Sequence, residues 1–163
     1  MEKKITFSKL PANVGELTSM PEFRLDDPFV TAALTVAVLC NYEKDPSATA
    51  QMLNVLKGPR PLSPFEIQFL RDRLADKGYK PFSFFAGSSP ANNYTPSLPY
   101  TVAVSDNPYS YQNEGYAKLY LQSAGADSPR AVDLRKKGDG SWLLWEQFLL
   151  SDIRMPVKDD PWA

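Results

Sequence analysis

The sequence predicts an α+β fold in which helices come first and an antiparallel sheet comes last. Three observations lead to this fold class. An uncharged apolar stretch runs from Phe29 to Cys40, two further segments before residue 79 open with helix-capping signals, and residues after 100 alternate between apolar and polar. Because helical and strand patterns are separated along the chain, βαβ units are excluded. We expect N-terminal helices, one of them central and buried, to pack on a C-terminal antiparallel sheet.

Size and composition are those of one globular domain. The chain has 163 residues, 43% of them hydrophobic and 23% charged, which is enough to bury one core but too short for two. We therefore expect a single domain over residues 1–163. Its parts are a wrapped N-terminal segment (1–25), a helical part (26–78), a loop rich in proline and aromatic residues (79–99), an antiparallel meander (100–150) and an irregular tail (151–163).

The first regular element is a short strand around Ile5 and Phe7, whose apolar side chains alternate with polar ones. The central helix follows. Asp27 can accept backbone N–H bonds as its N-cap, and proline at position 28 suits the first helical position. The β-branched residues of this stretch favour a strand instead, but the uninterrupted run is longer than most strands. A membrane span needs about 20 apolar residues, so this shorter run is predicted to be a core helix.

The second helix is predicted from Pro46 to about Lys57. Asp45 and Pro46 repeat the cap-then-proline signal, and Gly58 stands where a glycine commonly ends a helix. One face of this segment is apolar. It should therefore pack on the central helix.

The third helix opens with a capping box, Ser63 to Glu66, with proline at its first helical position. We expect it to run to Lys77 and to be closed by Gly78. Its apolar residues form two stripes, one of Ile67, Leu70 and Leu74 and another of Phe65 and Phe69. Two apolar faces predict contact with two layers of the fold.

The last third of the chain predicts an antiparallel meander. Four segments alternate between apolar and polar side chains, at residues 101–105, 116–123, 130–136 and 141–147. The turn sequence Lys137–Gly140 joins the last two as a tight hairpin. Because the spacing of Trp142 and Trp145 is odd, a regular strand cannot point both toward the same side, and at least one should be in the core.

Residue types exclude several chemistries. The chain has no histidine, so Ser-His-Asp, Cys-His and His-metal sites are excluded, and its single cysteine, Cys40, lies in the apolar helix and cannot form an internal disulfide. No catalytic residue, cofactor or metal site is predicted, which argues against an enzyme.

The net charge is −1 with scattered lysines and arginines, so no nucleic-acid or membrane partner is expected. The N-terminus lacks a signal-peptide pattern, which makes the cytoplasm the expected location.

Two groups of residues are candidates for binding. The first is a polar and aromatic strand face, and the second is a turn that combines a carboxylate, a hydroxyl and a guanidinium. The face comprises Tyr116, Lys118, Tyr120 and Gln122, joined by Asp133, Arg135 and one of Trp142 and Trp145, of which we take Trp142; the turn contributes Asp127, Ser128 and Arg130. The alternatives are, for the strand face, a solvated surface or one covered by the proline-rich loop, and for the second group an ordinary turn. In the tail, Trp162 can anchor in a groove of its own domain or of a partner, or remain loose.

The segment Tyr116–Glu146, YAKLYLQSAGADSPRAVDLRKKGDGSWLLWE, resembles the closing strands of cystatin-like and NTF2-like folds. This resemblance implies helices packed on a curved sheet around a cavity. The chain lacks the Asp-His pair of the hydratase and dehydratase members. With its ADSPR loop, its W-x-x-W-E element and its acidic Pro-Trp-Ala end, the whole chain also resembles an uncharacterised bacterial family, a domain of unknown function with no assigned activity.

These observations predict a cytoplasmic, non-enzymatic binding domain for a protein partner that the sequence does not identify. The alternative is a small-molecule site, with or without catalysis, in an NTF2-like cavity between sheet and helices. Ligand and oligomeric state stay open.

Overall fold

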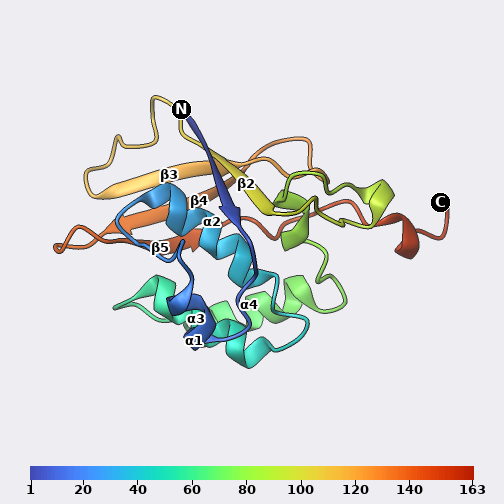
Figure 1. Cartoon of the computed structure of the whole chain (residues 1–163), viewed down its shortest axis with the longest axis horizontal. Coiled ribbons are helices and arrows are strands. Elements are labelled where there is room, and N and C mark those ends of the chain that lie inside the picture. The colour runs from blue at the N-terminus through green and yellow to red at the C-terminus, as the bar shows by residue number, and fades with distance from the viewer.

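The computed structural model describes residues 1–163, and its five strands form an antiparallel meander in the order β1-β2-β3-β4-β5. The strands are β1 (Glu2–Phe7), β2 (Tyr100–Ser105), β3 (Tyr116–Leu121), β4 (Arg130–Lys136) and β5 (Trp142–Gln147). The helices are α1 (Val14–Ser19), α2 (Pro28–Leu39), α3 (Pro46–Lys57) and α4 (Pro64–Leu74). Helices thus precede all but one strand, and the predicted α+β class is confirmed (Figure 1).

Helix α2 is the centre of the molecule. It contacts all five strands on one side and α3 on another, and every residue from Phe29 to Leu39 is buried. The Asp27 carboxylate accepts the Phe29 N–H at 2.9 Å, which confirms the predicted N-cap. The Thr31 hydroxyl donates to the carbonyl of Trp142 at 2.8 Å and ties α2 to β5. A helix that is apolar all round is stable here because protein covers it on every side.

The inner face of the sheet supplies the other half of the core. Val102, Val104, Leu119, Val132 and Leu134 are fully buried and alternate with half-buried or exposed neighbours. Strand β1 pairs with β2 over its whole length and forms one edge of the sheet. The predicted N-terminal strand is therefore confirmed, and it lies at an edge of the sheet.

A β-bulge interrupts the pairing of β4 with β5. Asp133 pairs with Glu146 but Leu134 pairs with Leu144, so Trp145 has no partner on β4. The extra residue rotates the end of β5 relative to its start. Before the bulge β5 alternates regularly, so Trp142 packs against the core, while Trp145, three residues later, contacts Tyr116 on the opposite face. The expectation that the two tryptophans cannot share a face is confirmed.

Helix α4 differs from its prediction in two ways. Its capping box is present, with Ser63 and Glu66 bonded reciprocally, but the helix ends at Leu74 and not at Lys77. The reason is Asp76, whose φ of 59° is left-handed and cannot continue a helix. The second apolar stripe is only partly covered: the Phe65 side chain is 78% exposed and Phe69 is half-buried. The predicted second packed face is therefore incomplete.

The segment between α4 and β2 is folded into short 3₁₀ turns, Pro81–Phe84 and Pro90–Asn92. The Asn92 side chain bonds to the backbone of Gly87, Ser89 and Thr95. Tyr94 is buried and donates its hydroxyl to the Arg154 carbonyl. This segment therefore holds the C-terminal tail.

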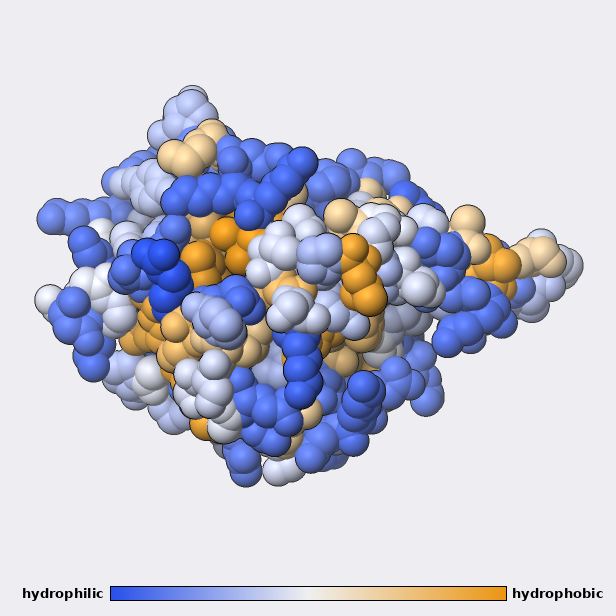
Figure 2. All heavy atoms as spheres, in the orientation of Figure 1, coloured by the Kyte–Doolittle hydropathy of each residue, from blue (hydrophilic) through white to orange (hydrophobic).

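The tail ends away from the core (Figure 1). The Trp162 side chain is 93% exposed, so anchoring in a groove of its own domain is contradicted. On the face drawn in Figure 2, hydrophilic residues cover most of the surface and hydrophobic ones form small separate areas. No helix combines the length and apolarity that crossing a membrane requires; the apolar α2 has only 12 residues.

Candidate functional site

The face of the sheet that points away from α2 carries the predicted polar and aromatic residues. We call it the open face. Because side chains alternate along a strand, Tyr116, Lys118 and Tyr120 of β3 point to this face while Ala117, Leu119 and Leu121 are buried. On β4, Asp133 lies opposite Lys118 and Arg135 lies opposite Tyr116. The register therefore brings most of the predicted face together.

Two arginines and two aromatic rings make contact on the open face. The Tyr116 and Trp145 rings pack edge to face with centroids 5.9 Å apart. The Arg135 guanidinium lies 4.7 Å from the Trp145 ring centre and 5.4 Å from that of Tyr116. The Arg60 guanidinium lies 4.4 Å from the Trp145 ring centre. We call these four residues the arginine–aromatic cluster.

Arg60 reaches this cluster because the chain after α3 runs directly against β5. Gly58 has a φ of 66°, and a Cβ atom there would lie 2.6 Å from a methyl carbon of Leu143. The neighbouring Lys57 ammonium is buried and donates to the Trp145 carbonyl at 3.2 Å. These contacts fix the path of residues 58–60 along β5 and place Arg60 beside the bulged tryptophan.

A basic hollow of about 350 Å³ lies beside the cluster. Its lining includes the cations Lys57, Arg60, Arg135, Lys136 and Lys137, and none of its ten lining residues is Asp or Glu. The positive charge of Lys57 is compensated by Glu66, whose carboxylate oxygen lies 3.2 Å from the Lys57 ammonium nitrogen. The other four cations have no ion pair and no side-chain hydrogen bond within the chain. Unpaired guanidinium groups held in fixed positions suit carboxylate and phosphate oxygens.

Lys118 and Tyr120 lie next to the cluster without belonging to it. The Lys118 ammonium pairs with Asp133 at 2.8 Å and lies 5.3 Å from the Phe148 ring centre. Tyr120 is half-buried opposite Ala131. Lys118 therefore adds no free positive charge, and Tyr120 extends the surface along β3.

The predicted turn residues lie elsewhere. Arg130 donates to the Ser151 hydroxyl and the Asp152 carbonyl, both at 2.6 Å, and Asp127 pairs with Arg154 at 3.0 Å. Asp127 and Ser128 are exposed. Arg130 and Arg135 are five residues apart on β4, about 16 Å at the rise of a strand. The turn therefore fastens residues 151–154 and does not share a site with the cluster.

Trp142 is also outside the cluster. It packs against the core, and its backbone bonds to Leu25 and Thr31. Trp145 takes the position for which Trp142 was selected. Arg60, Lys136 and Lys137 were not among the residues predicted from the sequence. Gly58 is the one local signal near Arg60, and it indicates only a helix end.

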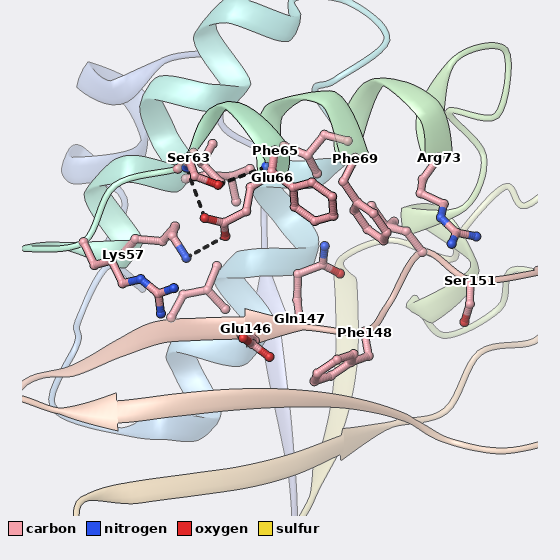
Figure 3. Close-up of a pocket in the computed structure, with 16 residues that line it drawn as sticks. Lys57, Ser63, Phe65, Glu66, Phe69, Arg73, Glu146, Gln147, Phe148 and Ser151 are labelled. Carbon is pink, nitrogen blue, oxygen red and sulfur yellow. Dashed lines mark hydrogen bonds and ion pairs between the residues drawn. The ribbon is translucent and has the colours of Figure 1, made fainter.

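A second concave surface lies between α4 and the end of β5, with a volume of about 540 Å³ (Figure 3). We call it the α4 groove. The Phe65 and Phe69 rings point from α4 toward Gln147, and Phe148 lies on the other side of the strand. The second apolar stripe of α4 therefore faces this groove. It replaces the expected cavity between sheet and helices, since no residue of α2 lines any of the five main pockets.

Glu66 connects the groove to the buried Lys57. Partial burial opposes ionisation of its carboxyl, but hydrogen bonds from the Ser63 backbone and from Lys57 outweigh it, so the pKa of Glu66 lies below its usual value. The carboxylate therefore stays charged and neutralises Lys57 at neutral pH. In the core, burial raises the pKa of the Cys40 thiol well above its usual value.

No group of three or more acidic, cysteine or histidine side chains is placed to hold a metal ion.

The sequence model of one family, described as Domain of unknown function (DUF6935), matches residues 9–157. Comparison with curated proteins and with solved structures gives no match. The family match confirms the resemblance to a domain of unknown function, and it supplies no activity. Because it covers nearly the whole length, the chain belongs to the DUF6935 family.

Proposed function

We propose that this chain is a non-enzymatic interaction domain that binds a protein partner through the arginine–aromatic cluster on the open face. The observation that carries the proposal is the pair of guanidinium groups, Arg60 and Arg135, that lie beside Trp145 without a carboxylate partner. Arginine, tryptophan and tyrosine are the residues most enriched where partners contribute binding energy. A bacterial, cytoplasmic setting stays part of this proposal; its cytoplasmic part agrees with the single cysteine, which is free and buried.

The cluster is suited to binding because it is already ordered. Tyr116 and Trp145 are half-buried and packed edge to face, so little side-chain entropy remains to be lost on association. Each exposed cation–aromatic contact contributes about 0.5–1 kcal/mol, which holds the guanidinium groups in place. A partner therefore meets a preformed surface.

The test is affinity capture from the native cell with a tagged full chain and a double variant, Tyr116→Ala with Arg135→Ala. The matched control is Tyr109→Ala with Arg71→Ala, because both residues are exposed and lie outside the cluster. We expect a specific partner to be lost with the first variant and kept with the control, while both melt within a few degrees of the unaltered chain. Equal capture by all three proteins would contradict the proposal.

A second candidate function is binding of a small apolar molecule in the α4 groove. Its volume of about 540 Å³ lies within the range of known ligand sites, about 300–1,000 Å³. A ligand that binds only the folded chain would raise the melting temperature. The supporting result is a stabilising compound whose effect disappears in Phe69→Ala; a metabolite screen without any stabilising compound would count against this function.

A further inference from the structure

We infer that the basic hollow binds a short acidic segment of the partner protein, whose carboxylates contact the guanidinium groups of Arg60 and Arg135. This inference rests on the proposed function and adds the chemistry of the partner. The hollow has a strong local excess of positive charge although the chain as a whole has a net charge of −1. A complementary segment must therefore be negative at this place.

The position of the guanidinium groups over the Trp145 ring supports carboxylates as the bound groups. Arg60 and Arg135 lie 4.4 and 4.7 Å from the Trp145 ring centre. A guanidinium beside a ring uses its flat face for the ring and keeps its N–H edges free for oxygen acceptors. Neither guanidinium group donates a hydrogen bond within the chain, so these side-chain donors are unused. Lys136 and Lys137 add two positive charges from the hairpin side.

Negative charges around the hollow limit the length of the segment. Glu146 follows Trp145 directly and lies opposite Asp133 in the register of β4 and β5. Asp139 lies in the adjoining hairpin turn. A long uniform polyanion such as nucleic acid would extend from the hollow onto these carboxylates and be repelled. The volume of about 350 Å³ accommodates only a few side chains. Both facts favour a short acidic stretch of a protein.

The first experiment titrates the ¹⁵N-labelled full chain with a hexaglutamate peptide and, separately, with a hexaglutamine peptide. We expect saturable shifts of the Arg60 and Arg135 Nε–H and Trp145 indole N–H signals with hexaglutamate alone. A single-stranded oligonucleotide of the same charge is the third probe and should bind more weakly than the peptide. The inference is overturned by absence of binding, by shifts located elsewhere, by equal response to hexaglutamine, or by tighter binding of the oligonucleotide.

The second experiment compares R60Q/R135Q with the control R71Q/K44Q, which removes the same charge from exposed positions outside the hollow. Loss of two charge-assisted contacts should weaken hexaglutamate binding about tenfold or more, and the control should stay within about twofold. Equal weakening in both variants would mean that only the overall charge matters and would overturn the inference.

The captured partner distinguishes failure of this inference from failure of the proposed function. If capture is lost in Tyr116→Ala/Arg135→Ala but kept in R60Q/R135Q, the open face binds a partner and the acidic segment is wrong. If neither variant affects capture, the proposed function fails as well. Both statements require that capture of the partner is lost with each of the two variants. They also require that a high salt concentration restores capture with neither variant.

Discussion

The backbone of Gly58 lies against the Leu143 side chain, and this contact decides where Arg60 can lie. Two physical constraints coincide at this residue. Its φ of 66° disfavours any residue with a Cβ atom, and a Cβ atom would collide with Leu143 at 2.6 Å. The glycine is thus required for the path of the chain along β5 as well as for the end of α3.

We predict that Gly58→Ala lowers the free energy of unfolding by about 1–3 kcal/mol, because backbone strain and the collision add. The measurement is urea unfolding. Gly138→Ala is the control, since nothing lies within 4 Å of its Cβ position and its φ is not left-handed. Equal effects of the two substitutions would show that the close approach to Leu143 is unimportant.

The two buried threonines of α2 have different roles. The Thr31 hydroxyl bonds to the Trp142 carbonyl of β5, whereas the Thr35 hydroxyl bonds to the Thr31 carbonyl in the preceding turn of its own helix. Thr31→Val should therefore cost about 1–2 kcal/mol and Thr35→Val less than about 0.5 kcal/mol, since only the first removes a contact between helix and sheet. Thermal and urea unfolding of both variants measure the difference; a larger loss for Thr35→Val would refute the assignment.

At the scale of elements, the attachment of α4 to the rest of the molecule depends on contacts made by its first turn. Only Leu70 and Leu74 of this helix are buried. Its start is fixed by the capping box and by the ion pair between Glu66 and the buried Lys57. The attachment of α4 is therefore polar to an unusual degree, and it should respond to pH.

We predict that Glu66→Gln destabilises the chain by about 1–3 kcal/mol at pH 7, because the buried Lys57 loses its counter-charge. The pKa of Glu66 is lowered in the folded chain, so the stabilisation is present above the ordinary glutamate pKa of about 4.3 and is lost as the pH falls through the folded value. The difference between variant and unaltered chain should therefore shrink below about pH 4. Urea unfolding at pH 7 and pH 3 measures it, with the exposed Glu114→Gln as control; a difference independent of pH would contradict the linkage.

The beginnings of helices could be predicted from sequence because their signals are local. Asp27, Asp45 and Ser63 each cap the helix that their position indicated. The end of α4 depends on the left-handed conformation of Asp76, and an aspartate gives a weaker signal for this than the glycine two residues later. Helix starts were therefore correct, and one helix end was three residues too long.

The candidate site could be predicted only where strand alternation determines it. Alternation places Tyr116 and Lys118 on one face, and the register adds Arg135. The odd spacing of Trp142 and Trp145 indicates opposite faces but not which of the two lies on the open face, and Arg60 depends on contact between segments more than eighty residues apart. No pattern within one segment carries such information, so the cluster could be found only from the structure.

At the scale of the whole molecule, stability is unevenly distributed. Helix α2 is buried along its entire length and contacts every strand, whereas α4 contributes two buried residues and the α4 groove separates much of it from β5. Regions with few buried apolar contacts open first in native-state fluctuations.

We predict that backbone amides of α4 exchange with solvent at least about tenfold faster than those of α2. Hydrogen exchange read by mass spectrometry resolves the two helices. Glu66→Gln should accelerate exchange in α4 further and leave α2 unchanged, which separates local opening from global unfolding. Equal protection of the two helices would show that the molecule opens as one unit.

The position of α2 in the chain also determines how the protein must be made. The helix is complete at Leu39, but the strand that closes the sheet over it ends at Gln147, 108 residues later. At a synthesis rate of about 5–20 residues per second, a helix that is apolar on every side waits about 5–20 s before its cover exists. During each round of translation the most hydrophobic segment of the nascent chain therefore stays uncovered for this time, which exposes it to contacts with the ribosome surface and with chaperones.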